Sequence, residues 1–213
     1  MMVQSVLDNL KNQTRRTKGL EYFNINPNRW RYDGQEQINP LIPIDKNYHW
    51  FEFVDKDGKA LEAYQKVKCP YGQVGDILWV RESFVKDGNS YLHKASHSLV
   101  EKFIKWKPSI HMPKDAARIF LEIRNIRIER LHDISESDAI EEGIRVEYDV
   151  MYPSDALYYF YPCNDLRDDS FISSAKTSFT SLWASINGWE SWNSNPWVWV
   201  IEFIRVEKPK NFN

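Results

Sequence analysis

The chain has 213 residues, of which 42% are hydrophobic, and this is enough apolar material for a folded core rather than a largely disordered protein. Its formal net charge of −2 argues against tight, sequence-independent binding of duplex DNA through a broad basic surface. The two cysteines, Cys69 and Cys163, provide neither a disulfide framework nor a CxxC metal motif, and no apolar run has the length of a signal peptide or a membrane span. We therefore expect a cytoplasmic protein with reduced thiols, no cofactor, no bound metal and no membrane contact.

The N-terminal residues combine an apolar stripe with a basic cluster. Val3, Val6, Leu7 and Leu10 follow helical spacing, which predicts a short amphipathic helix running into residues 11–16, Lys-Asn-Gln-Thr-Arg-Arg. On this prediction an amine, a hydroxyl and two guanidiniums lie within one or two helical turns. A lysine close to a threonine can act as base to nucleophile, and arginines suit an anionic or carbonyl-bearing ligand. The same basic residues would also complement the negative end of a helix dipole, so a structural interpretation stays open.

The first half of the remaining chain predicts loops and short strands. Residues 20–65 are polar, aromatic and broken by prolines, which predicts a loop-rich insertion. Within it, residues 49–54 and 59–64 flank an Asp-Gly turn and predict a β-hairpin. Turn residues then lead into a predicted strand over 77–84, and a further short strand is expected at 91–95.

The second half carries the stronger signals. Residues 118–131 predict the longest strand, with a change of phase near Asn125 that indicates a bulge or a barrel corner. Ser135 then begins a short helix, with Asp138 at the capping-box position and Gly143 placed to end it. Residues 145–170 are acidic and without periodicity, which predicts a second loop-rich insertion.

The C-terminal region predicts one more helix and a closing strand. Apolar residues at helical spacing from Phe171 to Ile186 predict an amphipathic helix that Gly188 stops. Residues 197–206 predict a strand that is apolar on both faces at first. Short strands and helices around one core indicate an α+β fold, a small β-barrel with flanking helices.

Several of these stretches, taken together, match the motifs of a known protein family. The chain resembles the phage- and prophage-associated branch of the ASCH family, which belongs to the PUA-like superfamily of small β-barrels. The resemblance implies a single ASCH/PUA-like domain over residues 1–213, with insertions at about 20–65 and 145–170. The stretches that carry it, in family order, are residues 11–16, 69–72, 75–82, 106–113, 134–143 and 195–203.

The resemblance also implies a catalytic site. Some ASCH members hydrolyse an amide on acylated cytidine with a Lys, a Thr and a Glu; Lys11 and Thr14 match the Lys-x-x-Thr pattern, and Glu142 matches the acid. Two features depart from the family: Asn12 stands where Thr or Ser is usual, and the β-strand that usually precedes the first helix is absent. A carboxylate near Lys11 would raise the lysine pKa and the neighbouring arginines would lower it, so the outcome is open at this point.

Three functions remain as hypotheses. The first is an enzyme, namely an amidohydrolase acting on an acylated cytidine-like base. A ribonuclease is the alternative enzyme, because other ASCH members have been linked to RNA cleavage. The second is a non-catalytic RNA-binding module, and the third is a phage accessory protein with a protein partner. The expected ligand is RNA, a nucleoside or a modified base. The side chains expected to contact that ligand are Arg15, Arg16, Lys107, His111 and Arg118, although His111 also suits a turn-stabilising role.

Overall fold

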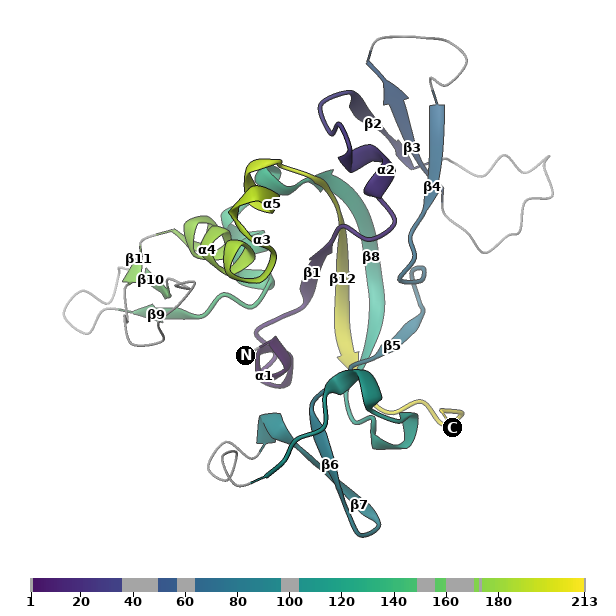
Figure 1. Ribbon diagram of the computed structural model, residues 1–213, viewed down its shortest axis with the longest axis vertical. Helices are drawn as coiled ribbons and strands as arrows, with labels where there is room; N and C mark the ends of the chain where they lie inside the picture. The colour runs from purple at the N-terminus through teal and green to yellow at the C-terminus, as the bar shows by residue number, and fades with distance from the viewer. Residues whose placement is uncertain are drawn as a thin grey trace.

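A curled antiparallel sheet lies at the centre of the computed structural model (Figure 1). The structure describes residues 2–35, 50–56, 64–96, 104–148, 156–159, 171–172 and 174–212. Among these residues the molecule is mixed α/β, mostly strands with few helices, and the curled sheet forms a half-barrel, which agrees with a small α+β fold. The order of the sheet is β1 (Gln13–Arg16), β12 (Trp197–Val206), β8 (Phe120–Arg130) and β5 (Ile77–Trp79).

Smaller elements surround this central sheet. In Figure 1 one three-stranded sheet stands above it, a two-stranded hairpin below it, and a second three-stranded sheet lies beyond the helices. The upper sheet comprises β2 (Trp30–Gln35), β3 (Trp50–Asp55) and β4 (Tyr64–Lys68); the hairpin comprises β6 (Phe84–Asp87) and β7 (Ser90–His93); the third comprises β9 (Val146–Tyr148), β10 (Ala156–Tyr159) and β11 (Phe171–Ile172). The α-helices are α1 (Met2–Leu7), α2 (Glu21–Asn24), α3 (Glu136–Glu141), α4 (Ala175–Asn187) and α5 (Trp189–Asn193).

Strand β12 is apolar on both faces because both faces are covered. Trp197 and Trp199 belong to a core that includes aromatic residues of β3. Val198 and Val200 point the other way, into a core that includes Phe179 of α4. The predicted closing strand is therefore confirmed, and its lack of alternation follows from its central position in the fold.

A bulge bends the central sheet. Glu202 of β12 lies opposite Asn125 of β8, but the next residue, Phe203, lies opposite Ile123, so Arg124 is the extra residue. An extra residue on one strand increases the local twist and helps a sheet to curl. The change of phase predicted near Asn125 is thus confirmed.

The end of α3 is fixed closely against the N-terminal segment. Ser135 and Asp138 form the predicted capping box, and Gly143 follows the helix at a φ of +92°. A Cβ on Gly143 would lie 3.0 Å from both the Lys11 Cβ and the Ser5 Cβ. Glycine therefore permits both the turn and the close approach that places Glu142, the residue before it, beside Lys11.

The prediction that residues 11–16 continue a helix was wrong. Helix α1 ends at Leu7, and residues 13–16 form strand β1, which pairs with β12. Asn9 turns the chain at a positive φ of 56°, and Leu10 is 48% exposed instead of extending the apolar stripe. Pairing with a long central strand outweighs the weak helical preference of a few residues. Alternate residues of this stretch consequently face opposite sides of the sheet.

The segment predicted as a loop-rich insertion at 20–65 is structured where it is described. It forms α2, β2 and β3, and Phe23, Trp30 and Phe53 are buried in the core over the central sheet. Strand β3 pairs antiparallel with β4 at residues 64–68, so Tyr64 is the described residue of the expected partner segment 59–64 that pairs with it. Residues 57–63, which include the expected Asp-Gly turn, lie outside the described residues.

Other boundaries also differ from the predictions. The strand expected over 77–84 divides into β5, which ends at Trp79, and β6, which begins at Phe84, while the short strand near 91–95 is present as β7. Phe171 belongs to β11, and the helix begins only at Ala175, where Ser174 caps it. Part of the acidic segment 145–170 forms β9 and β10, and most of the rest lies outside the described residues.

No helix in the described ranges is long and apolar enough to cross a membrane.

Candidate functional site

Strand β1 separates two environments. Gln13 and Arg15 are buried on the side of α3, whereas Thr14 and Arg16 line a pocket on the other side of the strand. This division follows directly from the two-residue repeat of a strand. The side chains of the basic cluster at residues 11–16 are therefore divided between the two sides of strand β1.

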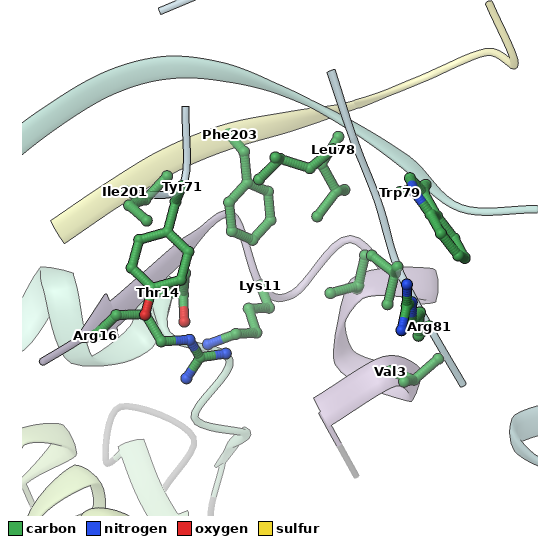
Figure 2. Close-up of a pocket in the computed structure, with 13 residues that line it drawn as sticks. Val3, Lys11, Thr14, Arg16, Tyr71, Leu78, Trp79, Arg81, Ile201 and Phe203 are labelled. Carbon is green, nitrogen blue, oxygen red and sulfur yellow. The ribbon is translucent and has the colours of Figure 1, made fainter. Parts of the chain in front are cut away.

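The pocket has a volume of about 410 Å³, within the usual range for small-molecule sites of roughly 300–1,000 Å³. It lies among β1, α1, β5, the start of β8 and the middle of β12 (Figure 2). Its surface is mainly apolar, with a few polar groups. The residues that line it are Val3, Val6, Lys11, Thr14, Arg16, Tyr71, Leu78, Trp79, Val80, Arg81, Leu121, Ile201 and Phe203.

Thr14 contributes an unusual hydroxyl to this pocket. Its backbone pairs with Ile201 of β12, which fixes the side chain toward the pocket. The Thr14 Oγ1 is buried and has no hydrogen-bond partner among the described residues. Because buried polar atoms nearly always have a partner, an unpartnered hydroxyl in a pocket is suited to a bound molecule.

Lys11 is buried beside Glu142. Its Nζ donates to the Glu142 Oε2 at 2.5 Å and to the Glu142 carbonyl oxygen at 2.7 Å, and a backbone bridge joins the same two residues. Burial lowers the pKa of Lys11 below its ordinary 10.5; the carboxylate of Glu142 acts in the opposite direction, and Arg16 and Arg15 add smaller lowering effects. Burial thus decides the question that the sequence left open. A lysine with a lowered pKa is more readily neutral and can accept a proton.

Glu142 supports Lys11 from outside the pocket. It does not belong to the described lining of the 410 Å³ pocket, but it lines a smaller one of about 100 Å³, to which Lys11 and Arg16 also contribute. The other carboxylate oxygen, Oε1, accepts from Arg15 Nη1 at 3.3 Å. Glu142 thus contacts both Lys11 and Arg15 and is not among the described residues that line the larger pocket.

Arg15 is held in a polar network, and it lines the smaller pocket but is not among the residues that line the larger one. Its guanidinium donates to Glu129 at 2.6 and 3.0 Å and to the Gln13 Oε1 at 2.6 Å, and it lies 3.4 Å from Asp138. Burial raises the pKa of Asp138, but hydrogen bonds from Gln13 and Ser135 and the nearby guanidiniums outweigh it and bring the pKa to about 2. The network therefore holds charged Arg15 and the start of α3 together.

Arg16, unlike Arg15, is exposed and makes few contacts. It is exposed at the surface, lines both pockets, and its one described hydrogen bond is a long one of 3.4 Å to the Arg15 carbonyl oxygen. In Figure 2 its guanidinium lies at the same end of the pocket as the Lys11 amine and the Thr14 hydroxyl. Its charge also acts on Tyr71, whose pKa is raised by burial and lowered by Arg16. Arg16 is thus available to a bound molecule.

The structure does not bring the other three predicted ligand contacts to this pocket. Arg118 forms an ion pair with Glu82, with nitrogen–oxygen distances of 2.7 and 2.8 Å, and Lys107 bridges to Phe84 through its backbone. His111 is exposed in a short 3₁₀ turn at 109–111. None of Lys107, His111 and Arg118 is among the described residues that line either pocket containing Lys11.

Three pocket residues were missed by the sequence analysis. Tyr71 lies in a stretch that indicates only a turn, Trp79 has the apolar spacing of a core residue, and Arg81 follows it in a strand pattern. The structure instead leaves Trp79 and Tyr71 half-buried at the pocket and Arg81 exposed beside it. No periodic signal in the sequence identifies them, because four consecutive residues, Leu78 to Arg81, line the pocket.

The described residues contain no group of three or more His, Cys, Asp or Glu side chains arranged to hold a metal ion. Cys69 is buried with a free thiol, and burial raises its pKa to about 11, so it is a poor nucleophile. Cys163 lies outside the described residues. Comparison with protein-family models, curated proteins and solved structures finds no match to this chain.

Proposed function

We propose that this chain is an ASCH-type, PUA-like amidohydrolase that removes an acyl group from the exocyclic nitrogen of a cytidine-like base. The observation that carries the proposal is the buried, unpartnered Thr14 hydroxyl, which shares a pocket with a lysine of lowered pKa. The curled half-barrel and the resemblance of the motifs to the ASCH family support the same assignment.

The proposed reaction uses Thr14 as nucleophile and Lys11 as base. The Thr14 oxygen forms a bond to the amide carbon while its proton passes to Lys11, whose lowered pKa favours the deprotonated form that the step requires, and the carbonyl electron pair moves onto oxygen. When the carbon–nitrogen bond breaks, the Lys11 ammonium returns the proton to the departing amine. Water then hydrolyses the threonine ester, which releases the carboxylic acid and restores the hydroxyl.

The remaining groups act on charge and position. Arg16 lies at the reactive end of the pocket and is suited to stabilise the negative oxygen of the tetrahedral intermediate. Glu142 holds the Lys11 amine in place through two hydrogen bonds to one residue. Aromatic side chains in the pocket, among them Tyr71 and Phe203, offer flat apolar surfaces to a base.

Thr14→Ala tests the proposal. With N4-acetylcytidine as substrate, we expect the wild-type protein to release acetate and Thr14→Ala to lose at least about a thousandfold in kcat, as is typical when a covalent nucleophile is removed. Its free energy of unfolding should change by less than about 1 kcal/mol, because the hydroxyl makes no hydrogen bond that folding depends on.

Thr14→Ser is the matched control, since it keeps the hydroxyl and should retain measurable turnover. Absence of turnover by wild-type protein across a panel of N-acylated nucleosides would overturn the proposed reaction. In that case salt-sensitive binding of single-stranded RNA, weakened by Arg16→Glu, would favour the non-catalytic RNA-binding module instead.

A further inference from the structure

The pocket carries positive charge without opposing acid. Its lining contains Lys11, Arg16 and Arg81, and no Asp or Glu is among the described residues that line it. Lys11 is already paired with Glu142. The two arginines are not: neither forms an ion pair with a carboxylate of the described residues, in contrast to Arg15 and Arg118. The pocket therefore favours a ligand that brings its own negative charge.

Arg81 is held in place by two contacts and remains accessible to an anion. Its guanidinium lies over the Trp79 ring, 4.8 Å from the ring centroid, which limits the positions it can take. One nitrogen, Nη1, donates to the Ile110 carbonyl oxygen at 3.1 Å, and Arg81 as a whole is exposed. An arginine stacked and anchored in this way can still offer paired N–H groups to a phosphate.

The two arginines lie at different ends of the pocket. In Figure 2, Arg16 is beside Thr14 and Lys11, whereas Arg81 is beside Trp79 and Val3, with apolar side chains between the two ends. The reactive hydroxyl is at the Arg16 end. A molecule whose reacting part lies near Thr14 and Arg16 can therefore extend along the pocket and place a second, negatively charged part near Arg81.

We propose that the pocket binds a nucleoside monophosphate rather than a free nucleoside, with the acylated base at Thr14 and the phosphate at Arg81. The assignment of a base to the Thr14 end rests on the proposed function; the anion at the other end rests on Arg81, which has no carboxylate partner among the described residues. A cavity of about 410 Å³ is of the size that binds such small molecules. In this arrangement the base lies against the apolar side chains near Thr14, and the phosphate accepts hydrogen bonds from the Arg81 guanidinium at the other end of the pocket.

Binding measurements on the Thr14→Ala protein separate this inference from catalysis, because they need no turnover. Titration calorimetry with N4-acetylcytidine 5′-monophosphate and with N4-acetylcytidine should show at least about tenfold tighter binding of the phosphorylated probe, the size expected for a charge-assisted contact. The difference should shrink on raising the salt concentration. A second variant, Arg81→Gln, should abolish the preference without affecting folding, since Arg81 is exposed.

Arg124→Gln is the matched control: this arginine is also exposed and on the same sheet, but it pairs with Glu122 and is not among the pocket-lining residues. It should leave the preference intact. Equal affinities for the two probes, no binding of either, or a preference that survives Arg81→Gln would overturn the inference, even if N4-acetylcytidine is hydrolysed. Much tighter binding of a single-stranded RNA oligonucleotide than of the monophosphate would also overturn it, in favour of an RNA chain as ligand.

Discussion

Arg15 and Arg16 are neighbours on one strand, yet they belong to two regions of opposite character. Arg15 is fully buried in a network in which each charge has partners from β8, α3 or β1 itself. Arg16 faces a pocket in which the polar groups have few partners. There the Thr14 hydroxyl has no described hydrogen bond, and Arg16 and Arg81 each have one, to a backbone carbonyl. The comparison teaches that residue type does not distinguish structural from functional polar groups, whereas the number of satisfied hydrogen bonds does.

The sharpest test of this contrast is a matched pair of substitutions. Arg15→Met should lower the free energy of unfolding by about 2–3 kcal/mol, because it removes a fully buried cation that Glu129 and Glu142 share and leaves them only Arg127 and Lys11 as described partners. Arg16→Met should change it by less than about 0.5 kcal/mol, since no ion pair is lost. Urea unfolding measures both, and similar losses for the two variants would contradict the division of β1 into a structural and a functional side.

A smaller effect is expected where α3 meets β1. Gly143→Ala forces an alanine into a φ of +92° and places its Cβ 3.0 Å from the Lys11 Cβ, so we expect a loss of about 1–3 kcal/mol together with reduced hydrolysis. Gly88→Ala, in the β6–β7 turn, has a positive φ but nothing within 4 Å of the new Cβ. It should cost less stability and leave turnover unchanged; a loss of activity there would show that the contact with Lys11 is not the cause.

The network side should also respond to acid. The pKa of Asp138 is lowered to about 2 in the folded state, below the ordinary 3.8, so the unfolded chain binds more protons between these values. The resulting stabilisation, about 1–2 kcal/mol, is complete above about pH 5 and is lost as the pH falls toward 2. Urea unfolding at pH 6 and pH 3 should show a smaller difference for Asp138→Asn than for wild-type protein; an equal difference would contradict the assignment.

The mildest expected change lies where the two regions meet. Glu142→Gln removes the charge that raises the pKa of Lys11, so this pKa should fall further and the acid limb of the pH–kcat profile should move to lower pH. The loss of kcat above that limb should be roughly tenfold at most, because the glutamine still accepts a hydrogen bond. A shift of the limb to higher pH would show that Lys11 is not the base.

Local sequence patterns predicted the elements whose signals are short-range. The capping box at Ser135 and Asp138, the helix stop at Gly188 and the bulge near Asn125 each depend on residues close together in the chain, and each is present. The same kind of reasoning failed at residues 13–16, because pairing with β12, nearly two hundred residues away, decides that they form a strand.

The candidate site divides in the same way. Lys11, Thr14 and Glu142 were expected from motif spacing and family resemblance. The structure pairs Lys11 with Glu142 and places Lys11 and Thr14 in the lining of one pocket, with no hydrogen bond to the Thr14 hydroxyl among the described residues. Lys107, His111 and Arg118 were also expected from the sequence, but they lie outside this pocket as described. Their residue type can be read from the sequence, but the contacts that each side chain makes cannot.

The amino-acid sequence by itself determined the capping box of α3, the apolar content of β12 and the presence of an amine near a hydroxyl. Only the tertiary structure decided which of two adjacent arginines is buried, which direction the Lys11 pKa moves, and that Tyr71, Trp79 and Arg81 complete the pocket. The physical reason is that burial and hydrogen-bond satisfaction depend on contacts between distant segments, and these quantities, more than residue type, set the charge and reactivity of a side chain.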